Sequence, residues 1–431
     1  MKFSTEAINQ IVSLIVSEFA NQLAEDNLKA GEVEESLREL TQEIGSKSYG
    51  KALTLLDEKK HGVEAKCQCG SKGKRVSRRE AKILSVFGWV SYLRSYYQDD
   101  ACGHRWHPLD ESEGLRAGRA TPLMSSLLAL SGVTVSFEEA QSQIKQYLGV
   151  EVSANTIREE TQSIGERQAL REEKWICQSQ DLDYLQKRER DEINLDHLYG
   201  SIDGAFALVE KEWQEVKTLC WYQAKSRYGD DLLHAQEIAY YSSLKRSEEF
   251  GELLWGTGVQ HRADQAKKLI FVCDGAAWIW KQVEKFFPNA VQIVDWYHAC
   301  QYLHAVANAL LLADDEQKKW LLKKEKLLWE GEVETIIKEC QTLVKEIGEP
   351  AKRLISYYSN NQERMRYALF REKNYLIGSG TVESACKQVV TMRLKRPGAS
   401  WTEYGAKMVA KARTAWLSGQ WETITKLPLA I

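Results

Sequence analysis

Two short apolar runs, each followed by an aspartate, constrain the fold of this chain more than any other feature. Leu269-Ile-Phe-Val-Cys precedes Asp274-Gly, and Val291-Gln-Ile-Val precedes Asp295. Short runs rich in β-branched and aromatic residues predict strands buried on both faces of a sheet. Residues 276–287, between the two runs, have the pattern of a helix. Open α/β sheets place their chemistry at the carboxyl ends of strands. The two aspartates therefore either share a site there or simply cap the helices that come after them.

A third predicted strand, His197-Leu-Tyr-Gly-Ser-Ile, also ends in an acid, Asp203. Residues 217–222 and 235–241 have the composition of neighbouring strands. Three strands followed by a helix and a further strand, with acids at the ends of the first and fourth strands, fit a mixed α/β sheet of the ribonuclease H kind. From residue 299 to about 370 the apolar spacing is helical throughout. Such a segment is too long for a connection within a compact sheet domain, so it predicts an all-helical insertion.

A glycine-containing turn, Gly378-Ser-Gly, precedes a predicted helix over residues 381–394. Glu383 lies in the first turn of this helix, and Lys387 lies one turn further along the same face. The helix either directs Glu383 toward the strand ends or is a capped, salt-bridged surface helix. Its basic residues are candidate DNA contacts: Lys387, Arg393, Lys395 and Arg396.

Asp203, Asp274 and Glu383 together supply three hard oxygen donors. Mg²⁺ (or Mn²⁺) prefers carboxylates, water and substrate phosphate to a closed cage of protein ligands, so three acids around an open site suit it. Two such ions about 4 Å apart activate a nucleophilic oxygen and stabilise the leaving oxygen during phosphoryl transfer on a nucleic-acid backbone. His298, three residues after Asp295, has two readings. It either orients a water or phosphate beside the ions or is a buried histidine that pins its helix to the sheet.

Residues 61–112 have the pattern of a zinc ribbon, in which two cysteine-bearing turns are joined by a β-hairpin. Cys67-Gln-Cys69 opens this segment and Cys102-Gly-His104 closes it. The first pair is C-x-C rather than C-x-x-C, and the second turn offers one cysteine, with Asp99, His104 and His107 as substitute donors. The segment therefore either holds one structural Zn²⁺, through Cys67, Cys69, Cys102 and His104, or is a ribbon that folds without metal.

The same ribbon and the helices after it carry candidate DNA contacts. The basic residues of the ribbon cluster in one turn and strand: Lys66, Lys72, Lys74, Arg75, Arg78, Arg79 and Lys82. Such a local excess can engage phosphates even though the net charge of the chain is −3. Residues 121–165 predict three helices, with a capping box at Ser136-Phe-Glu-Glu139 and a glycine turn before the third. This is a helix-turn-helix-like plan, in which the third helix presents Asn155, Thr156 and Arg158. A solvated hairpin and an ordinary helical bundle are the alternatives.

Other features bear on location and assembly. Residues 1–60 predict two or three amphipathic helices, broken near Gly31 and Gly45, which serve dimerisation, DNA contact or the capping of the ribbon. The nine cysteines, an odd number, lie mostly alone in apolar segments and indicate a reducing cytoplasm. We expect neither secretion nor membrane spanning, because no charged-then-apolar leader and no run of eighteen apolar residues occurs.

Taken in order, these motifs resemble bacterial insertion-sequence DDE transposases of the ISKra type, relatives of the Mutator group. The residues that carry the resemblance are Ile202-Asp203-Gly, Cys273-Asp274-Gly-Ala-Ala-Trp278, Phe287-Pro-Asn-Ala290, Asp295-Trp-Tyr-His298-Ala, Asn361-Gln-Glu-Arg-Met-Arg366-Tyr and Gly378-Ser-Gly-Thr-Val-Glu383-Ser-Ala-Cys-Lys387. The resemblance covers residues from about 60 to 425. It implies that Asp203, Asp274 and Glu383 form a catalytic triad on a ribonuclease H-like fold, and that Asp295-x-x-His298 is the [C/D]-x-x-H motif of the group. Lys66 and Asp99 stand where cysteines would complete two C-x-x-C pairs.

The resemblance further implies metal-dependent DNA cleavage at transposon ends and strand transfer into target DNA. Its expected partners are double-stranded DNA, both terminal inverted repeats and target, and further copies of the chain, in a bacterial cytoplasm at the nucleoid. Two other functions remain open: a catalytically inactive, transposase-derived DNA-binding protein, and a ribonuclease H-like nuclease without strand transfer. The expected domains are 1–60 (helices), 61–112 (ribbon), 113–195 (helix-turn-helix-like region and linker helix), 196–298 and 373–431 (catalytic core and C-terminal helices) and 299–372 (helical insertion).

Overall fold

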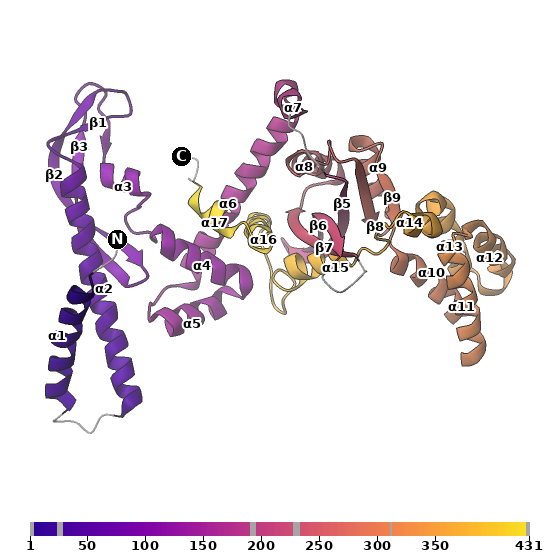
Figure 1. Cartoon of the computed structure of the whole chain (residues 1–431), viewed down its shortest axis with the longest axis horizontal. Coiled ribbons are helices and arrows are strands. Elements are labelled where there is room, and N and C mark those ends of the chain that lie inside the picture. The colour runs from indigo at the N-terminus through magenta and orange to yellow at the C-terminus, as the bar shows by residue number, and fades with distance from the viewer. Residues whose placement is uncertain (1–3, 24–28, 190–194, 227–232, 311–312, 428–431) are drawn as a thin grey trace. The chain divides into compact units, whose positions relative to one another are not determined.

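The computed structural model describes the chain apart from residues 1–3, 24–28, 190–194, 227–232, 311–312 and 428–431. The chain divides into two compact units (Figure 1). Unit 1 comprises Met1–Ser125 and Gln141–Ser153, and unit 2 comprises Ser126–Ala140 and Ala154–Ile431. Within the described ranges, no helix combines the length and the apolar character that a membrane crossing requires.

Unit 1 is built on an antiparallel four-stranded sheet in the order β1-β2-β3-β4. Its elements, in chain order, are α1 (Thr5–Leu23), α2 (Ala30–Lys60), β1 (Glu64–Lys66), β2 (Lys72–Ser85), β3 (Gly88–Gln98), β4 (Arg105–Trp106) and α3 (Pro108–Glu113). Helix α2 packs on β3 through a core that includes Leu53, Val90 and Tyr92. The ribbon thus takes its hydrophobic support from a long helix that precedes it in the chain.

The helix break expected near Gly45 is wrong, because α2 runs uninterrupted through this residue. A Cβ atom on Gly45 would lie 2.4 Å from the ring of Phe87, and one on Gly50 would lie 2.4 Å from the backbone oxygen of Ser91. These glycines let the helix approach the sheet closely and do not end it. The sequence also predicts a helix break near Gly31. Residues 24–28, which precede it, lie outside the described residues, and α2 begins at Ala30.

Helices α4 (Pro122–Thr134) and α5 (Phe137–Leu148) contribute residues to both units. They and α6 (Ala154–Ser179) confirm the three helices expected over residues 121–165. The capping box is also present: the backbone N–H of Glu139 donates to Ser136 Oγ (3.2 Å), and the backbone N–H of Ser136 donates to Glu139 Oε2 (2.8 Å). Helix α6 continues far beyond residue 165, and α7 (Leu182–Glu189) comes after it.

Unit 2 holds a five-stranded mixed sheet in the order β7-β6-β5-β8-β9. The strands are β5 (His197–Val209), β6 (Glu212–Ser226), β7 (Leu233–Ser243), β8 (Lys268–Cys273) and β9 (Val291–Val294). Strands β5, β6 and β7 form an antiparallel meander, whereas β8 pairs with β5, and β9 with β8, in parallel. All the strands expected from the sequence are present, and β8 is almost fully buried, as its apolar run predicts.

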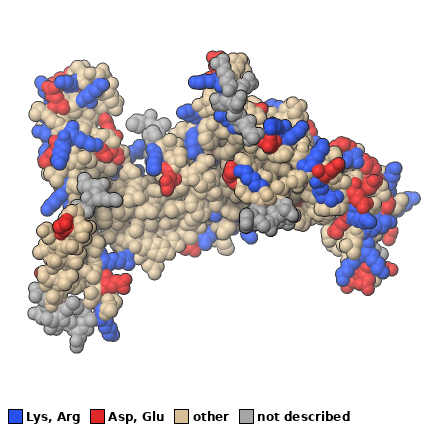
Figure 2. Space-filling model, viewed as in Figure 1, with Lys and Arg blue, Asp and Glu red and all other residues tan. Residues whose placement is uncertain are grey.

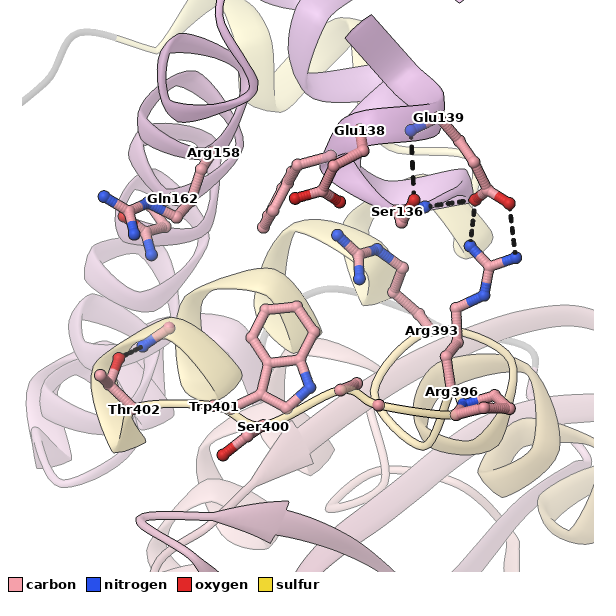
Figure 3. Close-up of a pocket in the computed structure, with 15 residues that line it drawn as sticks. Ser136, Glu138, Glu139, Arg158, Gln162, Arg393, Arg396, Ser400, Trp401 and Thr402 are labelled. Atoms are coloured by element: carbon pink, nitrogen blue, oxygen red, sulfur yellow. Dashed lines mark hydrogen bonds and ion pairs between the residues drawn. The ribbon is translucent and has the colours of Figure 1, made fainter. Parts of the chain in front are cut away.

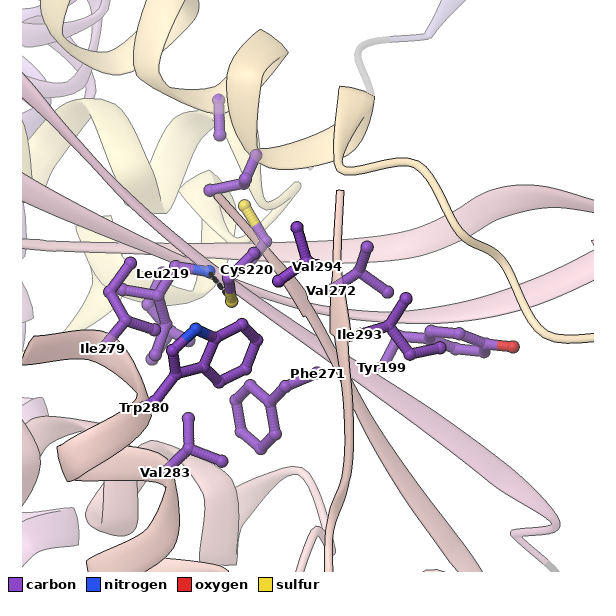
Figure 4. Packing of buried hydrophobic residues seen from close by; sticks show 14 of the residues in the cluster. Tyr199, Leu219, Cys220, Phe271, Val272, Ile279, Trp280, Val283, Ile293 and Val294 are labelled. Carbon is purple, nitrogen blue, oxygen red and sulfur yellow. Dashed lines mark hydrogen bonds between the residues drawn. The ribbon is translucent and has the colours of Figure 1, made fainter. Parts of the chain in front are cut away.

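Helices surround this sheet. The helices between and after the strands are α8 (Ser247–Gln260), α9 (Ala277–Phe286), α15 (Gly380–Cys386), α16 (Glu403–Leu417) and α17 (Trp421–Lys426). Figure 4 shows Trp280 and Val283 of α9 directed toward Phe271 of β8 in the main core. Helix α16 packs against β7 and α6, and the Lys411 ammonium is paired with the Glu172 carboxylate where α16 and α6 meet.

The segment between β9 and α15 is helical, as its apolar spacing predicts. It contains α10 (Trp296–Ala309), α11 (Asp314–Trp329), α12 (Val333–Ile347), α13 (Glu349–Asn361), the 3₁₀ turn η1 (Gln362–Met365) and α14 (Tyr367–Glu372). In Figure 1 these helices gather beside the β9 edge of the sheet. Two buried tyrosines hold them in place: Tyr367 donates to the backbone oxygen of Val294 in β9 (3.0 Å), and Tyr358 of α13 donates to that of Ala299 in α10 (2.9 Å).

Candidate functional site

The register of the three parallel strands brings three aspartates to one level of the sheet. Strand β5 pairs with β8 from His197↔Lys268 to Gly200↔Phe271, and the same offset continued three residues further places Asp203 beside Asp274. Strand β8 pairs with β9 up to Cys273↔Val294, so the next residues, Asp274 and Asp295, are also neighbours. Three adjacent strands therefore carry an acid at one level: Asp274 and Asp295 directly after the ends of β8 and β9, and Asp203 within β5. The strand end expected at Asp203 is wrong, because β5 continues in its pairing with β6 as far as Val209.

Asp203 lies among groups that oppose its ionisation. Burial raises the pKa of its carboxyl group, and the neighbouring Asp274 carboxylate raises this pKa further. The backbone N–H of Gly204 donates to Asp203 Oδ1 (2.7 Å) and partly offsets these effects. The Cys386 thiol also hydrogen-bonds this carboxyl group, and the Asp203 charge contributes to the raised pKa of that thiol, whose main cause is burial.

Asp274 is held at the end of β8 by backbone contacts. Its Oδ1 accepts a hydrogen bond from the N–H of Ala276 (2.9 Å), and its backbone oxygen accepts one from the Tyr357 hydroxyl (2.5 Å). The N-cap of α9 is Ala276, so Asp274 does not cap the helix that comes after it. The capping alternative is wrong for this residue, and its second carboxylate oxygen has no hydrogen bond among those found in the described chain.

Asp295 does cap α10, but it also makes a second contact that the sequence did not indicate. Its Oδ1 accepts a hydrogen bond from the N–H of His298 (2.7 Å), and its Oδ2 accepts one from the N–H of Ser379. The side chain is almost fully buried. Because Ser379 immediately precedes α15, this one carboxylate joins the end of β9 to the turn from which Glu383 projects.

Glu383 lies on α15, which packs against β5 and β6. Its side chain is exposed, and Cys386, which contacts Asp203, lies three residues further on the same helical face. The expected continuous helix over residues 381–394 is wrong, because α15 ends at Cys386 and a π-helical turn, η2 (Lys387–Thr391), comes next. No ion pair between Glu383 and Lys387 occurs in the described chain, although the exposure of Glu383 is that of a surface helix.

Strand register brings Asp203 and Asp274 together, whereas Glu383 comes from a helix and does not complete a metal-binding cluster with them. In the described part of the chain, the ligand oxygens of Asp203, Asp274 and Glu383 are not all within 4.8 Å of one another. His298 is partly exposed, and its Nδ1 lies 3.5 Å from Asp295 Oδ1 without a hydrogen bond. The charge of His298 also acts on Asp203, lowering the pKa of that carboxyl group. His298 therefore faces the acids, and no side-chain hydrogen bond pins it to the sheet.

A cysteine cluster in unit 1 can hold a metal ion. The ligand atoms of Cys67, Cys69, Asp99 and Cys102 all lie within 4.8 Å of one another. The Sγ atoms of Cys67 and Cys102 are 3.6 Å apart, and Cys69 Sγ lies 3.2 Å from Asp99 Oδ2. The structure thus places Asp99 in the fourth position, where His104 was expected. The His104 ring instead stacks on Trp106, with ring centroids 5.3 Å apart.

Two turns build this cluster, and each supplies two of its members. The backbone N–H of Cys67 donates to the oxygen of Ser71 (2.8 Å) between β1 and β2. The N–H of Gly103 donates to the oxygen of Asp99 (2.8 Å) between β3 and β4. Hydrogen bonding, chiefly from the Ser71 hydroxyl, lowers the pKa of Asp99. The carboxylate is therefore ionised, as a metal ligand must be.

The basic residues of the ribbon are exposed but only partly free. Lys72 Nζ lies 3.3 Å from Glu64 Oε2, and Arg78 Nη1 lies 2.6 Å from Glu58 Oε1. The Arg79 guanidinium sits 3.5 Å above the ring centroid of Tyr96. In Figure 2, basic and acidic side chains are interspersed over the ribbon on the face shown. Lys66, Lys74, Arg75 and Lys82 are also exposed.

The candidate DNA contacts in unit 2 occupy different environments. On α6, Arg158 hydrogen-bonds Asn155 Oδ1, and Asn155 Nδ2 donates to Glu159 Oε1 (2.8 Å), while Thr156 is half-buried. Lys387 and Lys395 are exposed, and Arg396 is ion-paired with Glu139. Arg393 is only 2% exposed, although the basic run around it predicted a solvent-facing side chain.

Sequence reasoning missed the residues that contact the three aspartates. Cys386, Ser379 and Tyr357 come from segments far from the strands in sequence, and each contacts one of the three aspartates. The available signals were the position of Cys386 three residues after Glu383 and of Ser379 inside the glycine turn. Neither signal identifies a partner by itself.

The chain belongs to the uncharacterised protein family UPF0236, whose family model matches residues 23–426. The match spans both units and includes every candidate residue named above. No curated protein matches the chain.

Proposed function

We propose that this member of the family is a DDE transposase, which cleaves DNA at transposon ends and transfers the cut strand into target DNA in a metal-dependent reaction. The observation that carries the proposal is the register of the sheet. It sets Asp203 and Asp274 side by side on adjacent strands, with the helix that bears Glu383 packed across β5.

The topology of unit 2 supports a ribonuclease H-like core. An antiparallel meander of three strands is followed by a helix and two parallel strands, which add to the first strand in the order β7-β6-β5-β8-β9. The helices α10–α14 stand between β9 and α15, where an insertion domain is expected. We assign the helices to that insertion because they interrupt the chain between the second and third acid of the triad.

In this proposal Asp203, Asp274 and Glu383 hold two Mg²⁺ (or Mn²⁺) ions. Bound there, the ions supply a metal-activated nucleophilic oxygen and stabilise the leaving oxygen of the phosphodiester. Three carboxylates leave coordination positions for the water and substrate phosphate that Mg²⁺ prefers among its ligands. Asp295 positions α15 by accepting the Ser379 N–H, and His298 lies beside Asp203 to orient a water or phosphate oxygen.

We further propose that the cysteine cluster holds one structural Zn²⁺ ion. With Zn–S bonds of about 2.3 Å and Zn–O bonds of about 2.0 Å, a tetrahedral site has sulfur–sulfur edges of roughly 3.8 Å and sulfur–oxygen edges of roughly 3.5 Å. The separations of 3.6 Å and 3.2 Å in the cluster come within a few tenths of an ångström of these edges. The ion would stabilise a ribbon whose basic strand contacts DNA, in a protein that works as a homo-oligomer in the bacterial cytoplasm.

The catalytic proposal is tested with purified protein and the DNA segments that flank its gene, in Mg²⁺ or Mn²⁺. The wild-type protein should cut at the inverted repeats and join a pre-cut 3′-OH end to target DNA. Asp274→Asn should abolish both reactions. The matched control Asp196→Asn, in an exposed ion pair with Lys267 just before β5, should leave them intact. Normal cleavage by Asp274→Asn would refute the mechanism. If the wild-type protein cleaves DNA but does not join it, the protein is a nuclease without strand transfer. If it binds DNA and catalyses neither reaction, it is an inactive, transposase-derived DNA-binding protein.

A further inference from the structure

A pocket in unit 2 is lined by none of Asp203, Asp274 and Asp295 and lies outside the cysteine cluster. Its volume is about 570 Å³, within the range of small-molecule sites. It is formed by the start of α5, one face of α6 and the loop from η2 to α16. Figure 3 shows Arg393, Trp401, Glu138, Arg158 and Gln162 arranged around the hollow.

Arg393, at the base of this pocket, is a buried cation, and one of its guanidinium nitrogens is left without an acceptor in the described chain. Its Nε donates to the backbone oxygen of Gly132 (2.8 Å). Its guanidinium carbon lies 4.6 Å from the ring centroid of Phe137 and 5.0 Å from that of Trp401. The Nη2 group is buried and has no hydrogen-bond partner among the residues that the structure describes. Burying such a donor without a partner is unfavourable, so the site favours a ligand that offers an acceptor.

The charge of Arg393 persists at neutral pH. Burial, with smaller contributions from Arg413 and Arg396, lowers its pKa to about 10. A bare anion is nevertheless a poor fit, because the pocket is also lined by Glu138 and Glu139. Glu139 is already held by Arg396. The lining therefore combines hydrogen-bond donors, hydrogen-bond acceptors and the indole ring of Trp401. This combination suits a flat heterocycle whose edge carries both donors and acceptors.

Trp401 is the aromatic wall, and its backbone and ring are held in place. Its N–H donates to the oxygen of Leu208 (3.1 Å), and its own oxygen accepts from the N–H of Glu210 (2.8 Å). The indole Nε1 donates to the oxygen of Leu394 (2.9 Å). Trp401 is thereby attached to the end of β5, the strand that carries Asp203 six residues earlier, a span of about 20 Å. A ring stacked on Trp401 would be held at a defined distance from the acids.

We propose that this pocket binds an unpaired nucleobase of the DNA on which the acids act, an inference that rests on the proposed function. The base stacks on Trp401, and Arg393 Nη2 donates to a carbonyl oxygen or ring nitrogen on its edge. The exposed Arg158 at the rim meets the adjoining phosphate. Extruding a base from a duplex costs free energy, and stacking on an aromatic side chain offsets part of that cost. The pocket thus favours DNA that is already distorted or unpaired.

The test measures binding without divalent ions, so that cleavage plays no part. The probe is a DNA duplex containing one unpaired 2-aminopurine, compared with the same duplex fully paired. The wild-type protein should bind the unpaired probe about tenfold more tightly and quench its fluorescence. Trp401→Ala should remove both effects, Trp401→Phe should keep most of the preference, and the exposed control Trp329→Ala, on α11 and outside the pocket, should change neither.

Two further measurements keep the inference open to refutation. Because Trp401 packs against the core, the rim variant Arg158→Gln provides a second readout that does not disturb the interior: it should weaken binding of the unpaired probe severalfold. Inorganic phosphate should compete far less well than a deoxynucleoside monophosphate. Equal affinity for paired and unpaired probes, or equal competition by phosphate, would overturn the inference. Unpaired-base preference in a protein that cuts no DNA would instead count against the proposed catalysis alone.

Discussion

Asp295→Ala should show whether this carboxylate holds Glu383 in place, because the variant leaves Asp203, Asp274 and Glu383 themselves unchanged. The buried carboxylate accepts two backbone hydrogen bonds, from His298 and Ser379, and so links α10 to the turn before α15. A hydrogen bond to a charged group contributes about 1.5–3 kcal/mol, so removing both should cost about 3 kcal/mol of the free energy of unfolding. In a unit of this size that corresponds to a fall in Tm of roughly 6 °C.

The assay combines thermal unfolding with cleavage of end DNA at a temperature at which the variant is folded. Because α15 loses its attachment to β9, we expect cleavage to fall at least tenfold even in the fully folded variant. Asp295→Asn keeps one acceptor oxygen and should show about half of the stability loss. The control Asp196→Ala removes only an exposed ion pair, which contributes about 0–1 kcal/mol. Unchanged stability, or normal cleavage by folded Asp295→Ala, would show that this carboxylate does not hold Glu383 in place.

Three further predictions concern the charges and the cysteine cluster. Burial and the neighbouring Asp274 raise the pKa of Asp203, so the folded state loses stability as the pH rises through that pKa. Asp203→Asn should therefore raise Tm at pH 7 in the absence of divalent ions. Added Mn²⁺ should raise the Tm of the wild type only. Burial lowers the pKa of His261 to about 4, so the folded state holds this side chain neutral. The resulting stability is present above about pH 6.5 and falls, by up to about 3 kcal/mol, as the pH drops toward 4. His261→Gln should flatten this part of the pH profile of the unfolding free energy in denaturant titrations, and an unchanged slope would contradict the lowered pKa. Purified protein should contain one zinc per chain by elemental analysis, Cys67→Ser should lose it, and the exposed Cys177→Ser should keep it; a zinc-free, stably folded ribbon would exclude the metal.

Local patterns in the sequence were enough to predict most of the secondary structure. The apolar runs before Asp274 and Asp295 could be read as buried strands because both faces of β8 are covered, and the capping box at Ser136 has a local mechanism. Gly45 misled the prediction because a glycine can mark either a helix end or a close approach of two elements. Only the ring of Phe87, distant in sequence, decides between them.

The acidic residues of the candidate site could be named from the sequence, but the residues that contact them could not. The meeting of Asp274 and Asp295 is expected from the alternation of strands and helices, since parallel strands bring their carboxyl ends to one edge. Asp203 joins them from within β5 through the register with β8, which the sequence does not specify. The ribonuclease H-like core and the triad that includes Glu383 remain predictions. That Asp99 rather than His104 completes the cysteine cluster depends on where two turns meet, which the spacing of the residues does not specify.

The sequence by itself determined which segments become strands and helices, because hydrophobic periodicity and turn residues act over a few neighbouring positions. Only the tertiary structure decided which groups share an environment. It buried Arg393 between two aromatic rings, joined Asp295 to Ser379 and attached Trp401 to the end of β5. Most of these contacts link residues far apart in the chain, and their energies depend on burial and geometry that arise only when the whole unit has packed.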